Sequence, residues 1–86
     1  MFNYNSWINE TNPEVLKRKF EKILLESDFK ILNFVEYYFK PFGYTALFLL
    51  SESHFAIHTF PEENKTYIEL SSCVENQYKK FKEKII

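Results

Sequence analysis

Cysteine and glycine are almost missing from this sequence. Its 86 residues include one cysteine, Cys73, and one glycine, Gly43. A single cysteine excludes an intramolecular disulfide and any cysteine-rich metal site, so a reducing, cytoplasmic environment is the default expectation. A single glycine leaves no glycine-rich loop of the kind that binds phosphates. The length suits one domain, residues 1–86.

A strong net charge and long apolar runs are also lacking. Eleven basic and twelve acidic side chains give a net charge of −1, which provides no electrostatic footprint for nucleic acid. No apolar run approaches the ~20 residues needed to cross a bilayer. The first residues, MFNYNSWINET, have neither the basic start nor the apolar stretch of a secretion signal. We therefore expect no nucleic-acid partner and no membrane partner.

Aromatic residues, in contrast, are abundant. They make up 20% of the chain, with ten Phe and six Tyr, which is more than a small core is expected to hide. Aromatic side chains are favoured in ligand pockets and at subunit contacts, so some of them are expected there. The simpler alternative is that a small protein exposes part of its aromatic residues.

The apolar pattern predicts the element order β-α-β-β-β-β-α. Asn12 and Pro13 are typical of a helix start, and apolar residues at helical spacing follow as far as about Ser27. Strands are expected over residues 2–9, 29–39, 44–50, 55–60 and 66–72, and a second helix over 74–85. Short connections between the middle strands imply an antiparallel sheet. The predicted fold class is α+β, a two-layer α/β sandwich with an antiparallel sheet and two helices packed on one face.

Reactive side chains are concentrated in residues 50–62, LSESHFAIHTFPE. His54 and His58 would share one strand face about 13 Å apart, too far to share a metal ion, so no metal site is expected. One aspartate, Asp28, and no glycine-framed serine provide little for a serine hydrolase. Cys73, just before the second helix, is either a reactive thiol or a small buried hydrophobic residue.

The segment LSESHFAIHTFPE, followed by TYIELSSC, resembles the core of the small bacterial and archaeal S-adenosylmethionine decarboxylases, which are pyruvoyl-dependent enzymes. The correspondence runs without a gap from about Phe39 to Cys73. It includes Pro41, Gly43 and the twenty-residue step from Ser53 to Cys73. The two helices also fit the two-layer α/β protomer of this family.

The resemblance implies that the chain cuts itself between Glu52 and Ser53. The Ser53 hydroxyl would attack the Glu52 carbonyl, and elimination of the resulting ester would leave a pyruvoyl group, which forms a Schiff base with the substrate amine. The products would be a β chain, residues 1–52, and an α chain, residues 53–86. His58 matches the histidine that moves protons in processing, and Thr45 stands where relatives have a serine that supports it.

Further roles follow from the same resemblance. Cys73 matches the proton donor of the decarboxylation, and Glu62 matches a carboxylate that binds the ribose hydroxyls of S-adenosylmethionine. Phe39 matches an aromatic residue that stacks on the adenine from the partner subunit, and Phe55 and Phe60 are expected to flank the site. The family implies a homodimer of processed protomers and a self-made pyruvoyl cofactor.

Three positions depart from the family pattern. Val74 stands where glycine is usual, Tyr37 where a histidine is common, and Ala56 where serine or threonine is commoner. The expected reaction is decarboxylation of S-adenosylmethionine for spermidine-type polyamine synthesis. The alternatives are the same chemistry on ornithine or arginine, and an unprocessed, catalytically silent partner subunit.

The spacing within the motif raises one geometric question. Ser53 and His58 are an odd number of residues apart, so a regular strand would point them to opposite faces. We therefore expect Ser53 in a bend or bulge before the strand ladder begins. Ser51 and His54 also belong to the motif, but the pattern assigns no physical role to either.

Overall fold

The fold is a sheet covered on one side by two helices, in a computed structural model that describes residues 1–85. The chain forms, in order, β1 (Phe2–Ile8), α1 (Pro13–Glu26), β2 (Ile31–Tyr38), β3 (Tyr44–Leu50), β4 (Ser53–Phe60), the short 3-10 helix η1 (Pro61–Glu63), β5 (Lys65–Ser72) and α2 (Glu75–Ile85). The element order predicted from the sequence is confirmed.

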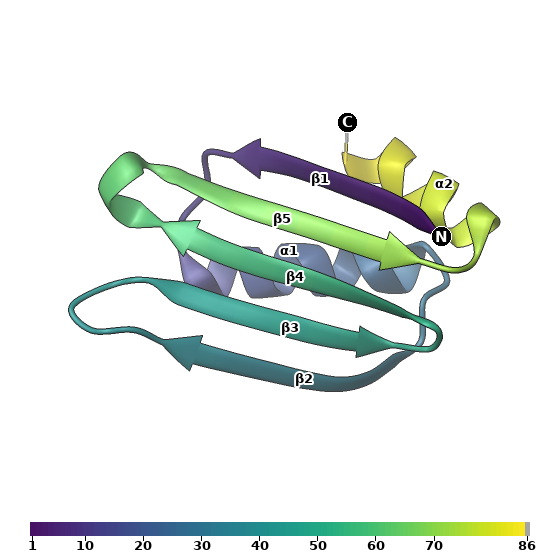
Figure 1. Cartoon of the computed structure of the whole chain (residues 1–86), viewed down its shortest axis with the longest axis horizontal. Helices are drawn as coiled ribbons and strands as arrows, with labels where there is room; N and C mark the ends of the chain where they lie inside the picture. The colour runs from purple at the N-terminus through teal and green to yellow at the C-terminus, as the bar shows by residue number, and fades with distance from the viewer. Residues whose placement is uncertain (86) are drawn as a thin grey trace.

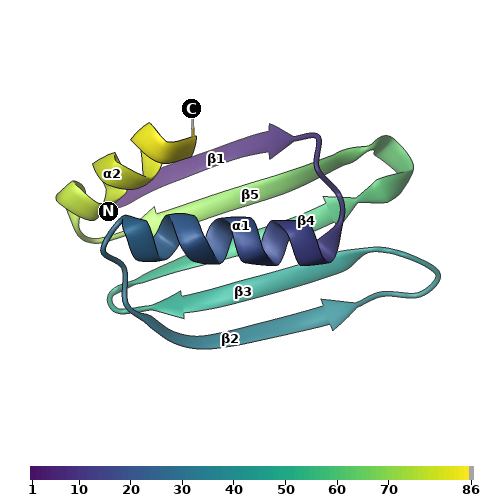
Figure 2. The ribbon, with the colours of Figure 1, turned by 180° about the vertical axis from the view of Figure 1, so that it is seen from behind.

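All neighbouring strands of the sheet are antiparallel, in the order β1-β5-β4-β3-β2 (Figure 1). The first strand of the chain thus lies at one edge, beside the last strand. Both helices lie behind the sheet in this view, and Figure 2 shows them in front of it from the other side. Helix α2 contacts α1, β1 and β5. The predicted two-layer α+β sandwich is confirmed.

Helix α1 begins where the sequence predicts. The side-chain oxygen of Asn12 accepts hydrogen bonds from the backbone amides of Glu14 and Val15, at 2.9 and 3.2 Å, which satisfies two donors that the first helical turn leaves free. Pro13 occupies the first helical position, where its missing N–H costs nothing. The predicted apolar stripe is buried against the sheet: Leu16, Phe20, Ile23 and Leu24.

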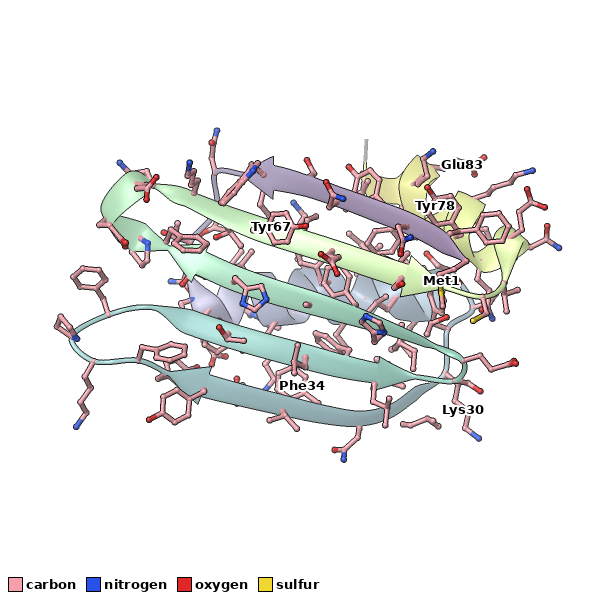
Figure 3. All side chains as sticks on the ribbon, in the orientation of Figure 1. Met1, Lys30, Phe34, Tyr67, Tyr78 and Glu83 are labelled. Atoms are coloured by element: carbon pink, nitrogen blue, oxygen red, sulfur yellow. The ribbon has the colours of Figure 1, made fainter. Side chains whose placement is uncertain are left out.

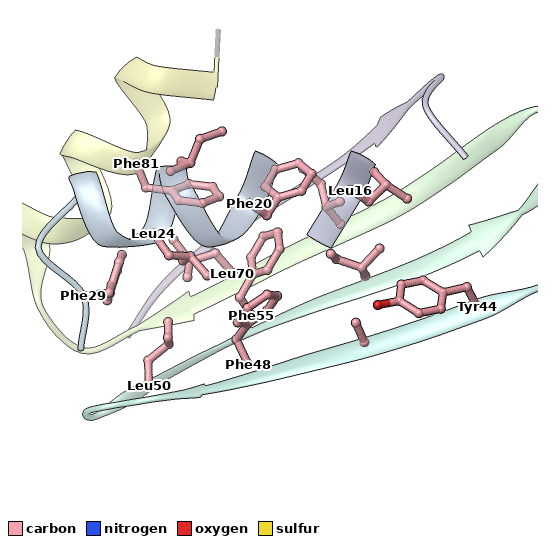
Figure 4. Close-up of a cluster of buried hydrophobic side chains, with 14 residues drawn as sticks. Leu16, Phe20, Leu24, Phe29, Tyr44, Phe48, Leu50, Phe55, Leu70 and Phe81 are labelled. Carbon is pink, nitrogen blue, oxygen red and sulfur yellow. The ribbon is translucent and has the colours of Figure 1, made fainter. Parts of the chain in front are cut away.

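The core lies between the helices and the inner face of the sheet (Figure 4). Its centre is a group of aromatic rings, in which Phe55 of β4 lies 4.9 Å from Phe20 and 5.4 Å from Phe81 between ring centroids. Phe55 is 0% exposed. The structure therefore places Phe55 inside the core and not beside a substrate, because alternate residues of β4 point toward the helices.

Several predicted boundaries differ from the observed ones by one or two residues. Phe29 was expected in a strand, but Asp28 has a left-handed backbone with φ 69°, and this turn sends Phe29 into the core before β2 begins. Helix α2 begins at Glu75, one residue later than expected. Strand β4 begins at Ser53, two residues earlier than expected.

Within residues 1–85, both helices lie on the inner face of the sheet, and the outer face is left uncovered. Figure 3 shows side chains standing on this face, among them Tyr67 of β5. Apolar side chains of β2 and β3 are exposed here, namely Val35, Tyr37, Leu47 and Leu49. We call this surface the open face. Neither helix of residues 1–85 has both the length and the apolar character that a membrane crossing requires.

Replacing Phe55 by alanine is expected to lower the free energy of unfolding by about 3–5 kcal/mol, because the change leaves a cavity in the core. Phe55→Leu keeps most of the apolar volume and should cost less than about 1.5 kcal/mol. Urea denaturation followed by circular dichroism measures both values. If Phe55→Ala is as stable as the wild type, Phe55 is not a core residue.

Candidate functional site

The hairpin between β3 and β4 contains the peptide bond expected to be cut. Leu50 and Ser53 are paired across the two strands, so the turn consists of Ser51 and Glu52 alone. Glu52 has φ 61°, a left-handed conformation that residues other than glycine rarely adopt. The bond between Glu52 and Ser53 is therefore preceded by a strained residue at the tip of a tight turn.

Ser53 is the first residue of β4 and already belongs to the ladder. It pairs with Leu50 on one side and with Ser72 on the other, and it is 8% exposed. Its hydroxyl lies 3.1 Å from the Ser72 hydroxyl. The expectation that Ser53 sits in a bend before the ladder is wrong, because a turn of only two residues leaves no room for such a bend.

Cys73 lies at the same end of the sheet as Ser53. It directly follows Ser72, the last residue of β5 and the cross-strand partner of Ser53. Cys73 is exposed, and its Sγ lies 3.9 Å from the Sδ of Met1, which is among the residues labelled at this end in Figure 3. Its exposure rules out the alternative of a small buried hydrophobic residue. We call Glu52, Ser53 and Cys73 the turn group.

His58 lies near the other end of β4, on the open face. Its Nδ1 is 3.2 Å from the Oγ1 of Thr45, its partner on β3. The cross-strand pairs place five side chains in one row: Trp7, Tyr67, His58, Thr45 and Tyr37. The Tyr67 ring stacks beside the imidazole, with centroids 6.4 Å apart and planes at 27°. Such neighbours fix the orientation of the histidine ring.

A surface hollow of about 390 Å³ lies beside His58. Its walls include five of the residues selected from the sequence, which we call the hollow group: Phe39, Thr45, His58, Phe60 and Glu62. The remaining lining residues are Phe42, Gly43, Tyr44 and Thr59. Gly43 has φ 115°, which only glycine adopts readily. This lets the chain turn there, so that the backbone amide of Phe39 donates to the carbonyl of Gly43 at 2.9 Å.

Two phenols near the hollow remain neutral hydrogen-bond donors. The Tyr44 hydroxyl donates to the Glu36 carboxylate at 2.6 Å; burial, and then this bond, raise the pKa of Tyr44 far above its ordinary value. The Tyr67 hydroxyl donates to Glu69 at 2.8 Å, and this bond, followed by burial, raises the pKa of Tyr67. Glu62 is therefore the one acidic residue among those that line the hollow.

The turn group and the hollow group do not meet within one chain. Ser53 and His58 are five residues apart on one regular strand, a separation of about 16 Å at the usual rise per residue, with side chains on opposite faces. One protomer thus presents the bond to be cut at one end of the sheet and the histidine near the other. Among residues 1–85, no three His, Cys, Asp or Glu side chains gather closely enough to hold a metal ion.

Sequence reasoning missed Ser72, Tyr67 and Trp7. Ser72 contacts Ser53 directly, while Tyr67 and Trp7 extend the row that contains His58. The signal for Ser72 was its position next to Cys73, together with a two-residue hairpin that would have set the register. Trp7 had no local signal, because β1 reaches its place only through pairing with the far end of the chain.

Comparison with known proteins gives one consistent family. A family model described as S-adenosylmethionine decarboxylase matches residues 8–85. The chain is similar to S-adenosylmethionine decarboxylase proenzyme 2 of Bacillus cereus, with 49% identity over 43 residues, covering 50% of this chain and 35% of that protein. It is also similar to the S-adenosylmethionine decarboxylase proenzyme of Thermotoga maritima, with 31% identity over 65 residues, covering 76% of this chain and 50% of that protein.

A solved structure shares the fold. The crystal structure of the adenosylmethionine decarboxylase from Aquifex aeolicus superposes with a TM-score of 0.77 at 19% identity, covering 98% of this chain and 75% of that one. The chain spans between about a third and a half of the length of the curated relatives named above. The motif-based assignment to this family is confirmed, because the family model covers nearly the whole chain.

Proposed function

This chain belongs to the S-adenosylmethionine decarboxylase family, and we propose that it is a pyruvoyl-dependent decarboxylase that makes its own cofactor by cutting the Glu52–Ser53 bond. The observation that carries the proposal is the geometry of that bond: Glu52 is left-handed at the tip of a two-residue turn, and a buried serine hydroxyl follows it. Such backbone strain, of the order of 1–3 kcal/mol, favours a reaction that opens the turn.

The proposed cut uses only groups of the chain and water. The Ser53 Oγ forms a bond to the carbonyl carbon of Glu52 while the C–N bond breaks and the hydroxyl proton passes to the nitrogen, which gives an ester. Removal of the Ser53 Cα proton then breaks the Cβ–Oγ bond, so that Glu52 leaves as a carboxylate and a dehydroalanine remains. Water replaces its nitrogen, ammonia leaves, and a ketone results.

The other residues receive roles from their positions. A pyruvoyl group supplies a ketone that accepts the electron pair left behind when CO₂ departs. Cys73, exposed at the same end of the sheet as Ser53, is proposed to return a proton to the carbon that lost CO₂. His58, with its ring held by Thr45 and Tyr67, is proposed to move the protons of processing.

The hollow suits an adenosyl group. Its volume of about 390 Å³ falls in the range of small-molecule sites. Phe39 and Phe60 offer aromatic surfaces for a flat base, and the Glu62 carboxylate can accept hydrogen bonds from two neighbouring hydroxyls of a ribose. We therefore propose S-adenosylmethionine as the substrate, in the synthesis of spermidine-type polyamines.

A homodimer would unite the two groups. A two-fold axis perpendicular to the strands places one end of a sheet against the opposite end of its partner, so the hollow group of one chain can face the turn group of the other. The open face offers apolar side chains for such a contact, with Leu47 and Leu49 about half exposed. We propose that two chains meet through their open faces and that each site combines His58 of one chain with the Glu52–Ser53 bond at the hairpin tip of the other.

Self-cleavage is tested by intact mass. The wild-type chain is expected to yield two fragments, residues 1–52 and 53–86, whereas Ser53→Ala should remain a single species near 10.5 kDa, since it lacks the attacking hydroxyl. Ser51→Ala is the matched control, because it removes a neighbouring hydroxyl and should still be cut. A wild-type chain that stays whole on incubation would contradict the proposal and favour a catalytically silent subunit.

Substrate choice is tested by CO₂ release from carboxyl-labelled S-adenosylmethionine, ornithine and arginine. We expect turnover of S-adenosylmethionine alone. Glu62→Gln should raise KM by about 10–100-fold, since it removes a charged hydrogen-bond acceptor. Glu63→Gln is the matched control, because Glu63 pairs with Lys65 outside the hollow, and its KM should not change. Turnover of ornithine or arginine without S-adenosylmethionine would assign the other substrate class.

The shared site is tested by complementation. His58→Ala and Ser53→Ala chains should each remain uncut when expressed alone. Co-expressed with different tags and purified as a mixed dimer of about 21 kDa (2 × 10.5 kDa), the His58→Ala chain should be cut, because its Glu52–Ser53 bond is served by His58 of the partner. An uncut His58→Ala chain in isolated mixed dimers would refute the shared site, and a wild-type protein that remains monomeric would refute the dimer.

A further inference from the structure

The Ser72 hydroxyl is the group in contact with the serine that is proposed to attack. Ser72 lies opposite Ser53 in the ladder, is 0% exposed, and has its Oγ 3.1 Å from the Ser53 Oγ. It has no role in the mechanism above. The chemistry of the reactive bond depends on which of these two buried hydroxyls donates the proton in their hydrogen bond.

The neighbours of Ser72 answer that question. A serine hydroxyl has one proton to donate and two lone pairs to accept with. The Ser72 Oγ lies 3.2 Å from the carbonyl oxygen of Val74, which can only accept, and 3.1 Å from the amide nitrogen of Val74, which can only donate. The single proton of Ser72 is therefore used on the Val74 carbonyl. In the contact with Ser53, Ser72 accepts and Ser53 donates.

This direction matters for the attack. The hydrogen bond that Ser53 donates to the buried Ser72 hydroxyl holds the Ser53 side chain in one rotamer. Any other rotamer would break this hydrogen bond. The Ser53 proton is then directed toward Ser72, and the Ser53 oxygen lone pairs are not engaged by Ser72. They remain available to form the bond with the carbonyl carbon of Glu52.

We propose that Ser72 is a positioning residue for self-cleavage, one that orients the Ser53 hydroxyl toward the Glu52 carbonyl. The inference rests on the proposed cut at Glu52–Ser53 and adds a residue to it. The same hydroxyl bonds both polar backbone atoms of Val74 and so fixes the backbone on either side of Cys73. Ser72 thus links the residue to be modified with the exposed thiol proposed to act after it.

The test compares three variants during cell-free synthesis, in which newly made chain is sampled over time and cut and uncut species are counted by mass. Ser72→Ala should slow the cut about tenfold or more, because Ser53 loses its buried acceptor. Ser72→Thr keeps the hydroxyl and should restore the rate to within about threefold of the wild type. Ser71→Ala is the matched control, since Ser71 donates to Asn3 at 2.6 Å from the same strand without touching Ser53.

Hydroxylamine identifies the step that is affected. It cuts an ester joining Glu52 to the Ser53 Oγ, so it reports whether the first step has occurred. If Ser72 orients Ser53 for that step, hydroxylamine should not restore the cutting of Ser72→Ala. Rapid hydroxylamine-dependent cutting of Ser72→Ala would show that the ester forms without Ser72 and would overturn the inference.

The remaining outcomes separate this inference from the proposed function. A wild-type chain that is cut while Ser72→Ala is cut equally fast overturns the role of Ser72 alone. Equal slowing by Ser71→Ala and Ser72→Ala would show a general loss of stability and would also overturn it, as would a Ser72→Thr chain as slow as Ser72→Ala. A wild-type chain that remains whole overturns both proposals.

Discussion

The two-residue turn between β3 and β4 is the constraint on which the rest of the site depends. Because Leu50 pairs with Ser53, every later residue of β4 has its face decided: odd-numbered residues point to the helices and even-numbered ones to the open face. The same register sets His58 opposite Thr45. A turn longer by one residue would move Phe55 out of the core and His58 into it.

Much of the fold was readable from local patterns. The Asn12 cap and the apolar stripe of α1 follow from rules that act within a few residues, and both are observed. The position of β1 beside β5 could not be predicted, because pairing between strands far apart in the sequence produces no local pattern of apolar residues. The burial of Phe29 was missed because Asp28 adopts a conformation more typical of glycine.

The motif and the geometry give different kinds of information about the site. The motif identified the family, and five of its residues do gather around one hollow. What it did not reveal is that Ser53 lies at the other end of the strand, on the other face. The odd number of residues between Ser53 and His58 already indicated opposite faces, but we expected a bend before the strand and therefore did not apply this rule to Ser53. The core position of Phe55 follows from the same parity.

The strand order has a consequence for the product of the proposed cut. Residues 53–86 contribute β4 and β5, which occupy the middle of the sheet, while residues 1–52 contribute β3 on one side of them and β1 on the other. The shorter fragment would therefore be hydrogen-bonded to strands of the longer fragment along both of its edges and would share one core with it. Cutting one peptide bond would yield two polypeptides that remain one folded unit without any covalent link.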